Sequence, residues 1–179
     1  MNKKKAVFHT LGCKVNQYET EAIKESFRKA GYDIAKEDEP ADVCVINTCT
    51  VTGLADRKSR QFIRRAKKNN PDAVVAVTGC YAQISPREVS SIEGVSVIVG
   101  TNEKTNLPEY VRRFSETGEK QIKCLNTEDI SDFEESVDTV SMGKRTREYI
   151  KIQEGCDRFC SYCIIPYARG RIRSRNLDR

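Results

Sequence analysis

The stretch AVVAVTGC, residues 73–80, is a run of apolar residues that ends in a glycine and a cysteine. Two other apolar runs also end in a cysteine: AVFHTLGC at residues 6–13, where glycine precedes it, and DVCVINTC at residues 42–49, where threonine precedes it. A fourth, VSVIVGT at residues 95–101, has a threonine at the corresponding place. Runs that are apolar at nearly every position are typical of strands buried on both faces of a sheet. We therefore predict four strands, over residues 6–11, 42–47, 73–78 and 95–99.

Each predicted strand is followed by a stretch with helical spacing. Between Glu19 and Ala30 apolar residues recur on one helical face, and Gly31 is expected to end that helix. Further helices are expected over residues 54–68, which are rich in Lys and Arg, in the region up to residue 92, and over residues 107–114. Strands that alternate with helices predict an α/β domain with a parallel sheet covered on both faces. We assign this domain to residues 1–123.

Three cysteines, Cys13, Cys49 and Cys80, each come one or two residues after a predicted strand. Parallel α/β sheets bind their ligands beyond the carboxyl ends of the strands. If the three strands are neighbours, the three thiols converge on one edge of the sheet. The alternative is that they are small buried residues, as free cysteines commonly are. Cys44 and Cys124 look like strand interiors, and we assign them no chemistry.

Three more cysteines lie in EGCDRFCSYC, residues 154–163, with the spacing C-x₃-C-x₂-C. In a reducing compartment, clustered cysteines indicate metal binding or catalysis before disulfides. Structural zinc takes four ligands, and the only histidine, His9, lies within a predicted strand. Cysteine thiolate is the usual ligand of iron–sulfur clusters, and three cysteines leave one iron of a four-iron cluster without a protein ligand. A zinc-binding module and a plain electron carrier are the alternatives, and each would need a fourth ligand.

The remainder of the chain is divided by its charge. Residues 124–143 are acidic and weakly periodic, which is typical of a linker, and residues 148–153 alternate like a strand that leads into the cysteine loop. Residues 144–179 hold ten Lys/Arg against four Asp/Glu, a net charge of +6, whereas the whole chain carries +5. Residues 1–143 therefore sum to about −1. A basic segment predicts a polyanionic partner, although a solvated tail would have the same charge.

The sequence gives no sign of membrane insertion. No apolar run approaches the roughly 20 residues of a membrane span. The basic start, residues 1–5, is not followed by the apolar core of a signal peptide. We expect a cytoplasmic protein without membrane contact.

Four motifs, TLGCKVNQYE, INTCTVT, VTGCYAQ and GCDRFCSYCIIPYARGRIRSR, together resemble the methylthiotransferase family of radical S-adenosylmethionine enzymes. The resemblance covers essentially the whole chain. Members of this family join an N-terminal cysteine-bearing α/β domain to a radical S-adenosylmethionine (β/α) barrel and an RNA-binding domain. The resemblance thus implies that residues 144–179 are the first strand and cluster loop of a truncated barrel. It also implies that the 179-residue chain alone is inactive.

The resemblance further implies two [4Fe–4S] clusters. Cys156, Cys160 and Cys163 would hold the cluster that binds S-adenosyl-L-methionine, and Tyr162 would back the adenine of that cofactor. Cys13, Cys49 and Cys80 would hold the cluster that carries the sulfur to be inserted. Arg169, Arg171, Arg173 and Arg175 are candidates for contacts with the cofactor or with RNA phosphates.

Within the family, LGCKVNQYET at residues 11–20 is similar to the branch that modifies threonylcarbamoyladenosine in tRNA. This similarity implies methylthiolation of C2 of N6-threonylcarbamoyladenosine next to the anticodon. The product would be 2-methylthio-N6-threonylcarbamoyladenosine. The partners it implies are tRNA, a sulfur donor, and an electron donor such as flavodoxin or ferredoxin. Methylthiolation of N6-isopentenyladenosine in tRNA, or a non-enzymatic iron–sulfur or zinc-binding module, are the alternatives.

Overall fold

The computed structural model describes residues 3–133 and 149–176. Its main element is a six-stranded parallel sheet with the strand order β2-β1-β3-β4-β5-β6. The strands are β1 Lys5–Thr10, β2 Asp33–Ile34, β3 Val43–Thr48, β4 Val74–Gly79, β5 Val95–Val99 and β6 Gln121–Lys123. The predicted parallel α/β sheet is confirmed. In addition, β1, β3 and β4 are direct neighbours, as convergence of the three cysteines requires.

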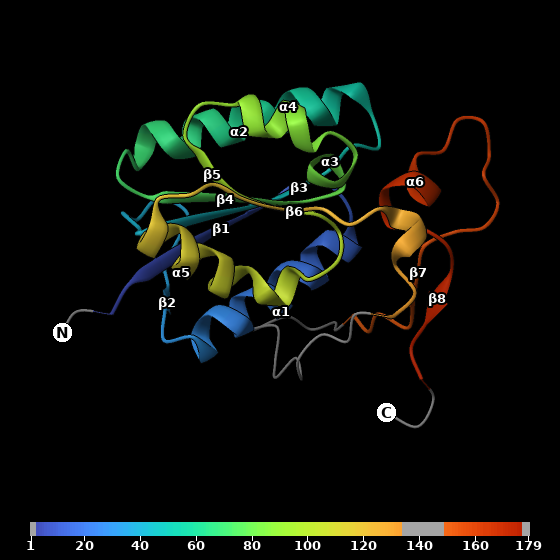
Figure 1. Ribbon diagram of the computed structural model, residues 1–179, viewed down its shortest axis with the longest axis horizontal. Coiled ribbons are helices and arrows are strands. Elements are labelled where there is room, and N and C mark those ends of the chain that lie inside the picture. The colour runs from blue at the N-terminus through green and yellow to red at the C-terminus, as the bar shows by residue number, and fades with distance from the viewer. Residues whose placement is uncertain (1–2, 134–148, 177–179) are drawn as a thin grey trace.

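Helices cover both faces of the sheet (Figure 1). On one face lie α1 Lys14–Lys29 and α5 Leu107–Thr117, and on the other lie α2 Gly53–Asn69, α3 Cys80–Ile84 and α4 Pro86–Ser91. Successive side chains of a strand point to opposite faces. Accordingly, Val7 belongs to the core beneath α2 and α4, whereas Ala6 and Phe8 belong to the core beneath α1 and α5. The result is two apolar layers on either side of one sheet.

Two helix predictions need correction. The first helix begins at Lys14 and not at Glu19, because its first turn contains polar side chains that hide the apolar spacing. It ends as predicted: Gly31 adopts a φ of +89° and donates its N–H to the carbonyl of Arg28. The helix predicted up to residue 92 is two short helices. The break falls at Ser85, because a residue before proline avoids the helical conformation, and Pro86 starts α4.

Residues 149–176 lie at the carboxyl edge of the sheet (Figure 1). There β7 Gln153–Glu154 pairs antiparallel with β8 Arg173–Ser174, and α6 Ile165–Arg169 packs against α3. The strand predicted over residues 148–153 is wrong for Tyr149–Ile152, which form no strand, while residue 148 lies outside the described residues. Strand formation needs a partner, and within residues 149–152 the structure describes one such contact, the hydrogen bond from Arg175 N–H to Ile152 O. That this segment begins a barrel stays a prediction.

The predicted linker, residues 124–143, is described as far as residue 133. A 3₁₀ turn, η2 Thr127–Asp129, is followed by the buried Ile130. Cys124 follows β6 directly and is half-buried, so its placement inside a strand was wrong, whereas Cys44 lies in the core of β3 as predicted. Within the described ranges, no helix is both long and apolar enough to cross a membrane.

Candidate metal centre at the sheet edge

The sheet-edge trio, which we define as Cys13, Cys49 and Cys80, lies where three adjacent strands end. Cys13 caps the start of α1, Cys49 follows β3, and Cys80 is the first residue of α3. Cys49 and Cys80 are buried and Cys13 is exposed. The sequence repeat therefore places all three at the same edge of one sheet.

Two glycines allow the turns of the trio to approach one another. A Cβ atom added at Gly12, whose φ is +97°, would lie 2.7 Å from the sulfur of Cys49. A Cβ atom added at Gly79, whose φ is +95°, would lie 2.3 Å from the carbonyl oxygen of Thr48. Both positions need glycine for conformation and for space. The glycines before Cys13 and Cys80 are thus part of how the edge is built.

Asn16 connects these turns from the first turn of α1. Its Nδ2 donates to the carbonyls of Leu11 and Thr48, at 2.7 and 3.0 Å. Its Oδ1 lies 3.8 Å from the sulfur of Cys13. The side chain is fully buried, and each amide hydrogen holds the backbone just before one cysteine turn. Asn16 therefore fixes the turns of Cys13 and Cys49 relative to each other.

The chemistry of the trio suits an iron–sulfur cluster, which cysteine thiolates hold. As the side chains stand, no three His, Cys, Asp or Glu residues among those the structure describes are grouped so as to hold a metal ion. Burial raises the pKa of the Cys80 thiol, and the nearby charges of Arg169 and Lys104 oppose that rise. Burial also raises the pKa of the Cys44 thiol, to about 11, although the charge of Lys67 opposes that rise. The assignment of both trios as metal ligands stays a prediction.

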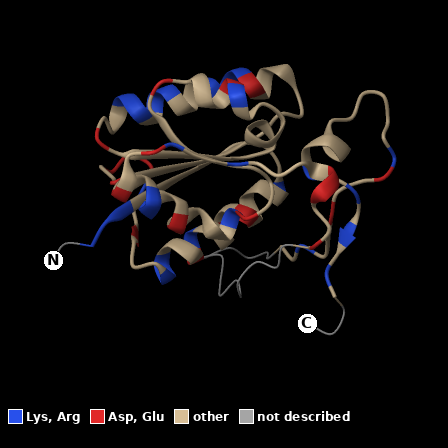
Figure 2. Cartoon of the chain, viewed as in Figure 1, with Lys and Arg blue, Asp and Glu red and all other residues tan. Residues whose placement is uncertain are grey.

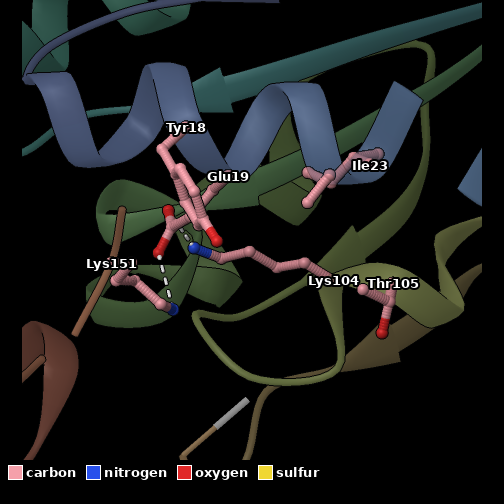
Figure 3. Close-up of a pocket in the computed structure, with 7 residues that line it drawn as sticks. Tyr18, Glu19, Ile23, Lys104, Thr105 and Lys151 are labelled. Carbon is pink, nitrogen blue, oxygen red and sulfur yellow. Dashed lines mark hydrogen bonds and ion pairs between the residues drawn. The ribbon is translucent and has the colours of Figure 1, made fainter. Parts of the chain in front are cut away.

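A group of charged residues with buried side chains joins this edge to the C-terminal segment, and Figure 3 shows three of them, Glu19, Lys104 and Lys151. We call it the ion cluster: Glu19, Lys104, Lys151, Glu154, Arg169 and Arg173. Glu19 projects from α1 between Lys104 and Lys151, as Figure 3 shows. Its carboxylate oxygens lie 2.5 Å from Lys104 Nζ, 2.7 Å from Arg169 Nη1 and 3.8 Å from Lys151 Nζ. One carboxylate of the sheet domain thus meets three cations.

Burial by itself would raise the pKa of Glu19, but the charges of Lys104 and Arg169 outweigh it and hold that pKa far below its ordinary value. Glu19 is therefore ionised at neutral pH. On the other side of the cluster, Glu154 Oε1 lies 2.5 Å from Arg173 Nη2, and its Oε2 lies 2.9 Å from Lys151 Nζ. A buried ion pair that loses one partner leaves an uncompensated charge, so removing any one of these side chains should destabilise the structure.

The candidate arginines divide into two kinds. Arg169 and Arg173 are buried in ion pairs with Glu19 and Glu154 and present no surface to RNA phosphates, which corrects that part of the prediction. The side chain of Arg171 is 73% exposed, and Arg175 is partly exposed. These two remain available for a polyanion.

The loop trio, Cys156, Cys160 and Cys163, surrounds a compact turn. Cys163 N–H donates to the Cys160 carbonyl at 3.0 Å, and Cys156 N–H donates to Gly170 O at 3.1 Å. Cys160 is exposed and the other two are half-buried. Tyr162 is 91% exposed. A pocket of about 350 Å³ lies beside this loop, lined by Thr127, Glu128, Phe159, Pro166, Tyr167, Gly170 and Arg171.

Three residues of this region were not predicted as functional: Asn16, Glu19 and Lys104. A signal existed for Glu19, since it lies four residues before Ile23 and eight before Phe27, on the buried face of α1. A carboxylate on an apolar helical face indicates a buried partner. Lys104 gave no comparable signal, because it lies in a short irregular segment, η1 Lys104–Asn106.

Comparison with known proteins places this arrangement in a family. Residues 5–100 match the family described as "Uncharacterized protein family UPF0004". The chain is 51% identical over 171 residues to the protein named threonylcarbamoyladenosine tRNA methylthiotransferase MtaB of Bacillus subtilis (strain 168), covering 96% of this chain and 38% of that protein. For the protein of the same name from Aquifex aeolicus (strain VF5), the identity is 42% over 178 residues, covering 98% and 42%.

A second group of relatives carries another substrate in its name. The chain is 31% identical over 186 residues to the tRNA-2-methylthio-N(6)-dimethylallyladenosine synthase of Clostridium perfringens (strain SM101 / Type A), covering 99% of this chain and 40% of that protein. The chain thus spans about two fifths of the length of the relatives it matches. It belongs to the UPF0004 family, and its predicted membership of the methylthiotransferase family is confirmed.

Proposed function

We propose that the protein containing this chain is a tRNA methylthiotransferase that acts at C2 of N6-threonylcarbamoyladenosine next to the anticodon. The observation that carries the proposal is the 51% identity, over 171 residues, to a relative named for this substrate. Identity to the relative named for dimethylallyladenosine is 31%. The chain covers 38% of the first relative, so the activity is proposed for the whole protein.

The two cysteine trios supply the ligands that this function needs. The sheet-edge trio would hold one [4Fe–4S] cluster and the loop trio the other, with S-adenosyl-L-methionine bound beside the loop. When bound, these groups supply the radical chemistry and the sulfur for methylthio insertion. Within the chain, Asn16 holds the turns of Cys13 and Cys49, and the exposed ring of Tyr162 is proposed to back the adenine. A sulfur donor, an electron donor such as flavodoxin or ferredoxin, and a cytoplasmic location complete the proposal.

The basic helix α2 offers a surface for tRNA. Its exposed Lys and Arg side chains are Arg57, Lys58, Arg64, Arg65 and Lys68. Figure 2 shows blue segments, which mark Lys and Arg, along α2, and this helix begins at Gly53, four residues after Cys49. The total charge of residues 1–143 conceals this helix, since acidic residues elsewhere cancel it. Phosphate contacts of such side chains position RNA without reading its sequence.

Replacing Arg57, Arg64 and Lys68 together by glutamine should weaken tRNA binding and make it less dependent on salt. Each lost phosphate contact reduces the magnitude of the slope of log K against log salt concentration by roughly 0.7–0.9, so the loss of three contacts should reduce it by about 2–3. The measurement is tRNA binding by the whole protein over a series of salt concentrations.

The matched control replaces Arg28, Arg112 and Arg113, which lie on the other face of the sheet and are paired with glutamates. This control should bind tRNA as the unaltered protein does. If both triple variants lose affinity equally, α2 is not the tRNA surface.

Deleting the gene tests the proposed activity. We expect 2-methylthio-N6-threonylcarbamoyladenosine to disappear from tRNA hydrolysates and N6-threonylcarbamoyladenosine to accumulate. The measurement is liquid chromatography of the nucleosides followed by mass spectrometry. A restored gene copy should reverse both changes. If the methylthio product persists while the isopentenyl derivative is lost, the substrate is the other adenosine and the proposal is wrong.

A further inference from the structure

We propose that Arg169 is a positioning residue that fixes the loop trio against the sheet edge, with Glu19 and Asn16 as its partners. The proposal rests on the proposed function only for what the two trios hold. The contact itself belongs to the chain and exists without any bound group.

Arg169 makes its contacts from the end of α6, six residues after Cys163. Its Nη1 donates to Glu19 Oε1 at 2.7 Å, while its Nη2 donates to Asn16 Oδ1 at 2.8 Å and to Glu19 Oε2 at 3.2 Å. A planar guanidinium meets several acceptors at once in a fixed geometry, which a lysine ammonium on a flexible stem does not. Arg169 therefore ties the end of α6 to the first turns of α1 through three hydrogen bonds.

The acceptors of Arg169 lead directly to the cysteines of the sheet edge. Asn16, which accepts from Arg169, also holds the carbonyls of Leu11 and Thr48, just before the turns of Cys13 and Cys49. A short chain of contacts thus runs from the loop trio through α6 and Arg169 to Asn16 and the sheet-edge trio. The two side chains that join α6 to the sheet edge, Arg169 and Asn16, are both buried.

A second contact holds α6 at the same edge. Thr101 is the residue that takes the place of the cysteine after the fourth strand, and its hydroxyl donates to the carbonyl of Ala168 at 3.0 Å. It is buried and lies next in the chain to Gly100, which follows β5. Three strand ends therefore present cysteines, whereas the fourth anchors the segment that carries the loop trio.

The charges of the ion cluster agree with a site for an anionic group. Among the described residues, the cluster contains four cations and two carboxylates, all buried. Buried charge is costly unless it is compensated, so an excess of buried cations at this edge favours a group of net negative charge. A cluster ligated by thiolates has that character.

Hydrogen exchange of the chain without bound clusters tests the proposal. The informative amides are those of Cys156, Ala168, Gly170 and Arg175, whose N–H groups are bonded within the C-terminal segment. In Arg169→Gln, their exchange should accelerate by roughly 10- to 100-fold, the effect of losing hydrogen bonds to a charged group. Amides of β1, β3 and β4 should keep their rates.

Three further variants sharpen the test. Glu19→Gln should accelerate the same amides, and the double variant should exceed neither single one by much, since both act at one contact. Arg169→Lys should retain part of the protection. Arg171→Gln, two residues away and exposed, should behave as the unaltered chain.

Unchanged rates in Arg169→Gln, or equal acceleration throughout the sheet, would overturn the proposal. So would additive effects of Glu19→Gln and Arg169→Gln. Because the assay contains no cluster, S-adenosylmethionine or tRNA, its outcome is independent of the tRNA nucleoside analysis. The hydrogen-exchange result can therefore refute the role of Arg169 while the proposed activity stands, and the nucleoside analysis can refute the activity while the role of Arg169 stands.

Discussion

Replacing any one of Cys13, Cys49 or Cys80 by alanine is expected to abolish iron binding by the sheet-edge trio, a loss of about four iron atoms per chain if it holds a four-iron cluster. The three residues end adjacent strands and would share one cluster, so one missing ligand should cost as much as three. The measurement is iron and sulfide content after anaerobic reconstitution, in a chain whose loop trio has been replaced by alanine. That background leaves only one trio able to load.

The chain offers internal controls for this experiment. Cys44 is buried within β3, and Cys124 is half-buried with its sulfur 3.6 Å from the carbonyl of Ala82. Alanine at either position should leave the iron content unchanged. The three thiols do not act as one ligand set if each alanine substitution removes a separate share of the iron and these shares add in the combined variants. A loss of iron in the Cys44 variant would have the same meaning.

Gly79→Ala is expected to destabilise the folded chain by about 3–5 kcal/mol, because backbone strain and a steric clash add at this position. The φ of +95° and ψ of −169° suit glycine alone, and the new Cβ would lie 2.3 Å from Thr48 O. The clash falls between β4 and β3, on the same Thr48 carbonyl that accepts from Asn16. Urea unfolding followed by circular dichroism measures the change in free energy of unfolding.

Gly31→Ala separates the two contributions. Gly31 also has a positive φ, +89°, but a Cβ there would meet no atom within 4 Å. We expect this variant to cost about 1–2 kcal/mol, the strain of a left-handed conformation alone. Equal losses in the two variants would mean that crowding at the sheet edge contributes nothing to the effect of Gly79→Ala.

The sheet could be predicted from the sequence because its determinants are local. Apolar runs such as AVVAVTGC report burial on both faces within six or seven residues, and Gly31 marks a helix end by conformation alone. The repeat did not predict the strand order. That β1, β3 and β4 are neighbours was an assumption, which the structure confirms. The ligand roles of the cysteines stay predictions, since their position at one edge does not by itself bring three sulfurs to one metal.

The partners within the ion cluster could not be predicted, although the position of Glu19 on the buried face of α1 was a signal, because the contacts are distant in sequence. Glu19 meets Lys104 across 85 residues and Arg169 across 150. Charged residues in a single sequence look alike whether they are solvated or paired, so Arg169 and Arg171 could not be told apart. The strand expected before Gln153 failed for a related reason: alternation favours a strand, but only a neighbouring strand forms one.

The alternation of buried Arg173 with exposed Arg171 has a consequence for how such a protein can change. Arg173 points its charge inward, where it is bound to Glu154, and a change there disturbs the architecture. Arg171 points outward from the same short segment, and its guanidinium lies near Asp157 and the ring of Phe159. Substitution of the exposed Arg171 can change what this surface binds, while the buried Arg173 preserves the structure of the segment. The two residues lie two positions apart in the chain, yet the binding surface can change in evolution without a change in the interior.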